Sequence, residues 1–138
     1  MADKELSWKY AEDFAAEPAP IAEARRHALE LGVDSVSAAT GAQLAVLAAA
    51  SSTHSILEVG TGAGVSGLWL LTGAPDATLT SLDVEFEHQQ LARNAFAEAQ
   101  VPANRIRLIT GRSAEVLPRM NDGAYDLVFV DADPAELL

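Results

Sequence analysis

The sequence predicts an α/β fold in which parallel strands alternate with helices that cover both faces of the sheet. Three observations support this prediction. From residue 55 onward, short apolar runs typical of buried strands alternate with stretches of helical length. The first apolar run ends in a glycine-rich turn at 60–64, which leads directly into a helix. Strands separated by such helices require right-handed crossovers, so they are expected to pair in parallel.

Three helices are expected before the first strand, so residues 1–50 form a helical cover and residues 51–138 form the sheet region. Ser7 can cap a short helix that ends at the prolines at 18 and 20. A second helix is expected at 21–31, closed by Gly32, and a third at about 37–50. These patterns place Trp8, Ala11 and Phe14 on one side of the first helix and bury Leu44, Val46 and Leu47 in the third.

Four strands are expected, at 55–59, 78–82, 106–109 and 125–130, with helices between them at 65–71, 87–100 and 114–120. The first strand is apolar except for Glu58, which is the pattern of a strand buried on both faces. The chain stops at VDADPAELL, just after the fourth strand. We therefore expect the second half of such a sheet to be missing and the fourth strand to be an exposed apolar edge.

Composition excludes several classes of function. The 138 residues carry a net charge of -11, which argues against binding a nucleic-acid backbone or an anionic membrane surface. The chain has no cysteine, so it has no disulfide and no thiolate metal site. Its start lacks the apolar core of a signal peptide, and its longest apolar run, 44–50, is too short to span a bilayer. A soluble cytoplasmic protein is expected.

The glycine-rich turn contains the clearest functional signal. Gly60, Gly62 and Gly64 follow the buried strand directly, so a ligand can approach the backbone N–H groups at the start of the next helix. The dinucleotide fingerprint G-x-G-x-x-G has Val65 where its third glycine would stand. The turn alone also fits a simple tight connection between a strand and a helix.

Three polar residues near this turn indicate the kind of ligand. Glu58 precedes the glycines, where a carboxylate would repel a pyrophosphate and attract an ammonium group. Asp83 ends the second strand, where an acid can accept both hydroxyls of a ribose or cap a helix. Ser66 can bind a carboxylate or cap its own helix. These groups suit S-adenosylmethionine better than a dinucleotide.

Several segments carry a family resemblance. ILEVGTGAGVSGLWLL, LDVE, RIRLITGRSAEVLPRM and YDLVFVDAD resemble the class I S-adenosylmethionine-dependent O-methyltransferases, in particular the bacterial form of the caffeoyl-CoA and catechol O-methyltransferase-like family. The resemblance covers about residues 36–133. It implies a Rossmann-like sheet of seven strands, of which this chain holds four in the order 3-2-1-4.

The resemblance also implies a set of cofactor-binding residues. Glu58 would contact the methionyl amino group directly or through water, Ser66 the carboxylate, and Asp83 the ribose. Val36 and Gly41 would lie beside the cofactor, Val84 would flank the adenine, and Ser113 and Ala114 would line its edge. The full set of cofactor-binding candidates is Val36, Glu58, Gly60, Gly62, Gly64, Ser66, Asp83, Val84, Ser113, Ala114 and Asp131.

A divalent cation such as magnesium is a further implication, with Asp131 as its first ligand. Related proteins complete that site with an Asp-Asn pair after the next strand, which this chain lacks, and an acid that caps the next helix explains Asp131 equally well. Many relatives have a lysine as candidate base where this chain has Pro134, so no catalytic base is identified.

The sequence therefore predicts an enzyme that transfers a methyl group to a hydroxyl of a small-molecule acceptor. The resemblance implies that the complete enzyme is a homodimer. Two alternatives stay open: a nicotinamide-dependent oxidoreductase domain, and a non-catalytic methyltransferase fragment. The sequence does not specify the acceptor. Trp69 is expected in the core, whereas Glu85 and Glu87 are expected to form a solvated helix start, and His27, His54 and His88 to lie at the surface.

Overall fold

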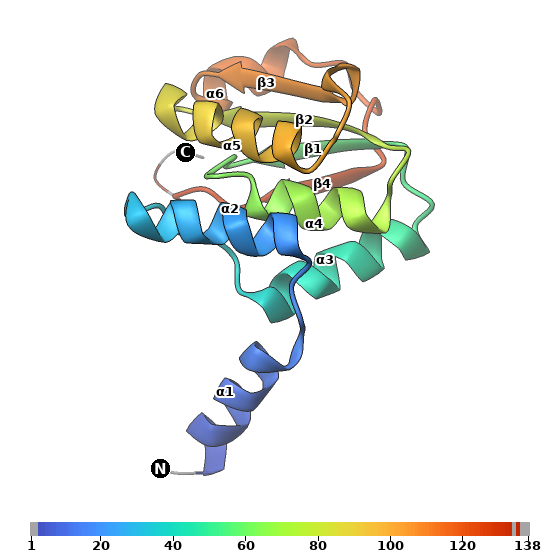
Figure 1. Ribbon diagram of the computed structural model, residues 1–138. Helices are drawn as coiled ribbons and strands as arrows, with labels where there is room; N and C mark the ends of the chain where they lie inside the picture. The colour runs from blue at the N-terminus through green and yellow to red at the C-terminus, as the bar shows by residue number, and fades with distance from the viewer. Residues whose placement is uncertain (1–2, 134, 136–138) are drawn as a thin grey trace.

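The sheet determines the architecture of the molecule (Figure 1). The computed structural model describes residues 3–133 and 135, and it confirms the α/β class. Four parallel strands lie in the order β3-β2-β1-β4, which is the order that the resemblance implies. The strands are β1 (Ser55–Val59), β2 (Thr78–Asp83), β3 (Ile106–Thr110) and β4 (Leu127–Val130).

Helices alternate with these strands as predicted, with small shifts at their ends. The α-helices are α1 (Asp3–Phe14), α2 (Ala19–Glu30), α3 (Ala38–Ala50), α4 (Val65–Gly73), α5 (Phe86–Glu98) and α6 (Ser113–Val116). In Figure 1, α2, α4 and α5 lie on one side of the sheet, and α3 packs beside α4. The helix predicted at 114–120 is divided into α6 and a 3-10 turn, Leu117–Arg119, because Pro118 interrupts the α-helical hydrogen bonds.

The main core lies between the sheet and the helices α2 to α5. Helix α4 is buried from Val65 to Leu71, as its apolar sequence on all sides predicts. Trp69 is only 5% exposed, which confirms its place in the core. A Cβ atom on Gly41 would lie 2.2 Å from the indole of Trp69, so only glycine lets α3 come this close to α4. Among the described residues, no helix combines the length and the hydrophobicity needed to cross a membrane.

Two expectations about the helical cover are wrong. Helix α1 begins at Asp3 rather than at Ser7, and none of its residues is buried; Trp8 and Phe14 are 70% and 73% exposed. In α3, only Leu44 of the three predicted core residues is buried, and Val46 and Leu47 are exposed. The reason is that α3 buries the single stripe of Gly41, Leu44 and Ala48. The uniformly apolar sequence of this helix does not indicate which stripe that is.

Asp126, in the turn before β4, joins the beginnings of two neighbouring strands. Its Oδ2 atom accepts hydrogen bonds from the backbone N–H groups of His54, at 2.8 Å, and Ser55, at 3.1 Å. These two bonds hold the pKa of Asp126 below its ordinary value of 3.8. The ionised carboxylate therefore secures β4 beside β1.

We expect Asp126→Asn to lower the midpoint of urea unfolding, because an amide oxygen accepts these two bonds without a negative charge. Because folding lowers the pKa of Asp126, its charge contributes stability that is fully present above pH 3.8 and is lost as the pH falls below it. The difference in unfolding midpoint between the parent and the variant should therefore shrink between pH 6 and pH 3. Asp122→Asn, a change at an exposed position in the same turn, is the control. A difference independent of pH would contradict this role of the charge.

Candidate functional site

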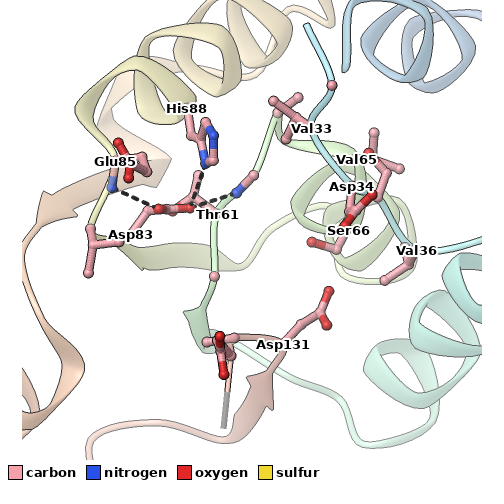
Figure 2. A pocket seen from close by; sticks show the side chains of 18 residues that line it. Val33, Asp34, Val36, Thr61, Val65, Ser66, Asp83, Glu85, His88 and Asp131 are labelled. Atoms are coloured by element: carbon pink, nitrogen blue, oxygen red, sulfur yellow. Dashed lines mark hydrogen bonds and ion pairs between the residues drawn. The ribbon is translucent and has the colours of Figure 1, made fainter. Parts of the chain in front are cut away.

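A pocket of about 370 Å³ opens at the carboxyl edge of the sheet. Its walls come from the glycine turn after β1, the end of β2, the loop before α3 and the segment after β4. Parallel α/β sheets bind ligands at this edge, because strand ends and helix N-termini meet there. Figure 2 shows Asp83 and His88 on one side of the pocket, Ser66, Val36 and Asp34 on the opposite side, and Asp131 below.

The glycine turn forms the floor of this pocket. Gly60 has a φ of +101°, and its N–H donates to the carbonyl oxygen of Leu82 at 2.7 Å. A Cβ atom on Gly60 would lie 2.0 Å from the carbonyl oxygen of Asp131. Only glycine combines this φ with such a close approach to another backbone segment. The turn and the segment after β4 therefore hold each other in place.

Asp83 connects the end of β2 to the glycine turn. Its Oδ2 atom accepts the N–H of Gly62, and its Oδ1 atom accepts the N–H of Glu85, both at 2.9 Å. The Nδ1 atom of His88 lies 3.6 Å from Oδ2. A carboxylate offers about four lone-pair positions, so Asp83 can hold this local structure and still accept hydrogen bonds from a ligand. The two interpretations of Asp83, ligand contact and local capping, are thus compatible.

Glu58 lies beneath the pocket rather than on its wall. Its side chain is fully buried, and its two oxygens accept hydrogen bonds from Ser66 Oγ at 2.5 Å and Ser81 Oγ at 2.7 Å. The hydroxyl of Thr61 lies 2.7 Å from that of Ser81. Burial raises the pKa of Glu58 to about 7, although the two serine hydrogen bonds lower it. Of the two serines that donate to Glu58, Ser66 lines the pocket and Ser81 does not.

Most of the predicted cofactor-binding residues gather at the pocket. Those that line it are Val36, Gly60, Gly62, Ser66, Asp83, Val84 and Asp131. Four others do not. Glu58 lies behind Ser66, and Gly64 packs against Ala92 of α5. Ser113 is buried beside a smaller adjoining hollow, and Ala114 is exposed. Gly41 packs against Trp69 and also does not line the pocket.

The sequence prediction missed residues 32–35 of the loop before α3 and two residues at the start of α5. Residues 32–35 line the pocket, and so do Glu85 and His88. Glu85 is exposed just before α5, and His88 is partly exposed, as expected of a solvated helix start and a surface residue. Their place on the pocket wall was not predicted. The available signal was position: the first turn of a helix that follows a strand lies at the same edge of the sheet as the ligand pocket.

The wall of the pocket is acidic. Its carboxylates are those of Asp34, Asp83, Glu85, Asp131 and Asp133, and none of its lining residues is Lys or Arg. Such a surface favours a cationic ligand group over a phosphate. Residues 3–133 and 135 contain no group of three or more His, Asp or Glu side chains placed to hold a metal ion. Asp131 stays a single candidate ligand, and Pro134 lies outside the described residues.

Comparisons with known proteins agree with this geometry. The family model described as "Methyltransferase domain" matches residues 57–136. A Mycobacterium tuberculosis protein named "Probable O-methyltransferase" is 51% identical over 133 residues, which cover 96% of this chain and 59% of that protein. A relative from Mycolicibacterium vanbaalenii is 53% identical over 128 residues, which cover 92% of this chain and 57% of the relative. The chain thus spans less than two thirds of the length of these relatives.

Solved structures share the fold. A crystal structure of a Corynebacterium glutamicum protein matches with a TM-score of 0.84 and 34% identity, covering 96% of this chain and 63% of that one. The O-methyltransferase TomG of Streptomyces achromogenes, solved in complex with S-adenosylmethionine, matches with a TM-score of 0.83 and 27% identity, covering 99% of this chain and 65% of TomG. The family resemblance noted from the sequence is confirmed, and the chain belongs to the methyltransferase domain family.

Proposed function

We propose that this chain forms the cofactor-binding part of an S-adenosylmethionine-dependent O-methyltransferase that acts on a hydroxyl of a small molecule. The observation that carries the proposal is the arrangement of Asp83 and Ser66 on opposite sides of one pocket above the glycine turn (Figure 2). Asp83 can accept ribose hydroxyls on one side, while Ser66, backed by Glu58, receives the amino-acid end on the other. The names of the relatives and the cofactor bound to TomG point to the same ligand.

The remaining candidates have supporting roles in this proposal. Val36 and Val84 supply apolar contacts on the pocket wall, and Gly60 and Gly62 let the ligand approach the backbone. Gly64 positions the first turn of α4 against α5. Ser113 and Ala114 would meet the edge of the adenine near the adjoining hollow. Asp131 would lie beside the amino-acid end or the acceptor.

S-adenosylmethionine, when held between Asp83 and Ser66, would supply an activated methyl group on its positively charged sulfur for transfer to the acceptor oxygen. The protein binds and orients the two reactants in line. The acidic wall complements the charges of the sulfonium and ammonium groups. The same wall disfavours the pyrophosphate of a nicotinamide dinucleotide.

Calorimetry with S-adenosylhomocysteine tests this proposal directly. We expect saturable binding of one ligand per chain, and no fluorescence change on titration with NADH. S-adenosylhomocysteine is the suitable probe because it keeps the ribose, the adenine and the amino acid of the cofactor. Tight binding of NADH without binding of S-adenosylhomocysteine would instead support the oxidoreductase alternative.

We further propose that the complete protein is a cytoplasmic homodimer. Helix α1 projects from the body in Figure 1 and exposes Leu6, Trp8, Tyr10 and Phe14, and a second copy would cover such a surface. The lack of cysteine suits a reducing compartment.

Light scattering of the complete protein and of a variant with Trp8→Ser and Phe14→Ser should give a dimer and a monomer, respectively. An unchanged dimer would remove α1 from the interface.

A further inference from the structure

The loop between α2 and α3 contains a buried hydroxyl group that has no hydrogen-bond partner. Among the described residues, Ser35 Oγ is the one buried side-chain nitrogen or oxygen in this state. The hydroxyls of Ser66 and Ser81 show the normal case, because both are buried and both donate to Glu58. A buried hydroxyl without a partner destabilises a fold, since it has given up its hydrogen bonds to water. The hydroxyl of Ser35 therefore needs an explanation outside the packing of the chain.

Ser35 lies on the wall of the ligand pocket. Figure 2 shows its two neighbours in the chain, Asp34 and Val36, on the same side of the pocket as Ser66 and opposite Asp83. The proposed function assigns the amino-acid end of the ligand to this side. The Oγ atom of Ser35 is itself shielded from water. A serine side chain has three staggered positions about its Cα–Cβ bond, so a rotation can turn the hydroxyl toward a ligand.

The backbone of this loop is held on both sides of Ser35. Before it, the N–H of Val33 donates to the carbonyl oxygen of Ala28 at 2.8 Å, which ties the loop to α2. After it, Ser37 Oγ accepts the N–H of Thr40 at 3.2 Å and caps α3. These bonds keep the loop at the pocket, while the hydroxyl of Ser35 remains available to another partner.

The charge of the pocket indicates which ligand group that partner is. The wall carries several carboxylates, including those of Asp34 and Asp131, and none of its lining residues is Lys or Arg. An ammonium group is therefore attracted by the wall as a whole. A ligand carboxylate finds no cationic side chain there, so it must be bound by hydroxyl and backbone N–H groups. A hydroxyl that donates to a carboxylate makes a stronger bond than one that donates to a neutral acceptor.

We propose that Ser35 turns its hydroxyl into the pocket when the ligand binds and donates a hydrogen bond to the carboxylate of the amino-acid end, beside Ser66. This inference rests on the proposed function, because it requires a ligand with an amino-acid end. The hydroxyl of Ser35 gains its partner in the complex, so it favours binding at the expense of the stability of the unbound fold. Ser35 thereby favours ligands that carry a carboxylate over those that lack one.

Ser35→Ala tests this inference with two ligands. One is S-adenosylhomocysteine, and the other is decarboxylated S-adenosylhomocysteine, which keeps the nucleoside, the thioether and the amine. By calorimetry, we expect the variant to bind S-adenosylhomocysteine about tenfold more weakly than the parent and the decarboxylated ligand equally well. The urea midpoint of the variant without ligand should be unchanged or higher, because the substitution removes an unpaired buried hydroxyl.

Ser37→Ala is the matched control, because it removes the same group two positions along the same loop. Ser37 caps α3 and does not line the ligand pocket. Its replacement should lower the urea midpoint and leave the affinity for S-adenosylhomocysteine unchanged. If Ser37→Ala weakens binding as much as Ser35→Ala does, a disturbed loop explains both results and the inference is overturned.

The remaining outcomes separate this inference from the function that it extends. An unchanged affinity of Ser35→Ala for S-adenosylhomocysteine, or an equal loss with both ligands, would overturn the bond to the carboxylate. A lowered urea midpoint would show that the hydroxyl already has a partner in the fold, such as an ordered water, and would overturn the inference as well. In each case, binding by the parent still supports the proposed function, whereas failure of the parent to bind either ligand would overturn both. If circular dichroism shows that Ser35→Ala does not fold, the decision rests on Ser35→Cys, whose thiol is a weak donor and should reduce the affinity in the same selective way.

Discussion

Asp83→Ala is expected to weaken the binding of S-adenosylhomocysteine by about 100-fold or more. Two ribose hydroxyls that donate to an ionised carboxylate contribute roughly 1.5–3 kcal/mol each, and every 1.4 kcal/mol corresponds to about tenfold in affinity. The same change removes the acceptor of the Gly62 and Glu85 N–H groups, so the glycine turn also loses one of its hydrogen bonds to the end of β2. Calorimetric titration of the parent and the variant measures the difference.

Two further variants separate ligand contact from local structure. Asp83→Asn keeps one carbonyl oxygen and should retain more of the fold than of the affinity, because an amide accepts fewer and weaker bonds than a carboxylate. The matched control is Asp76→Asn, at an exposed position just before β2 and outside the pocket, and this variant should bind as the parent does. Equal affinity in Asp83→Ala and the parent would rule out Asp83 as the ribose contact.

Gly60→Ala should destabilise the fold by about 3–5 kcal/mol, which is a large share of the stability of a domain of this size. The added Cβ atom would lie 2.0 Å from the carbonyl oxygen of Asp131, and the φ of +101° is strained for any residue with a Cβ. One of the two backbone segments must therefore move, and the floor of the pocket moves with it. Urea unfolding of the variant measures the loss, and calorimetry should show that binding is lost as well.

Gly123→Ala provides the comparison for Gly60. Gly123 also has a positive φ, +69°, but a Cβ atom there would meet no other atom within 4 Å. Its replacement should cost only the backbone strain of about 1–2 kcal/mol. The difference between the two variants is then the cost of the clash with Asp131. An equal loss of unfolding free energy in both variants would show that the close approach of Gly60 to Asp131 does not contribute to the cost of the substitution.

Local sequence patterns were sufficient for the sheet. The apolar run that forms β1, the acid that ends β2, and the glycine turn each depend on neighbours within a few residues, and the structure places them as predicted. The exposed faces could not be predicted in the same way. Val46 and Leu47 look like core residues, but they lie outside the stripe of α3 that packs against α4. That choice depends on Trp69 and Gly41, which meet only in the folded chain.

The site shows the same limit. The residues that the family motifs contain were found by their order in the sequence, whereas residues 32–35 of the loop before α3 were not, because they carry no motif. The place of Glu58 was also beyond the sequence. A strand-end acid can point into a pocket or beneath it, and the hydroxyls of Ser66 and Ser81, eight and 23 residues away, select the buried position.

The bond between Asp126 and the beginning of β1 spans 72 residues of sequence. Such long-range closure is slow compared with local pairing, because the intervening chain must give up its freedom first. The pairing of β1 with β4 should therefore form later than the pairing of β1 with β2, which closes a much shorter segment. On a ribosome, the α-helices and the β1–β2 pair can form early, but the floor beneath Gly60 is complete only once Asp131 has emerged. A ligand that needs this floor should consequently bind only after β4 has joined the sheet.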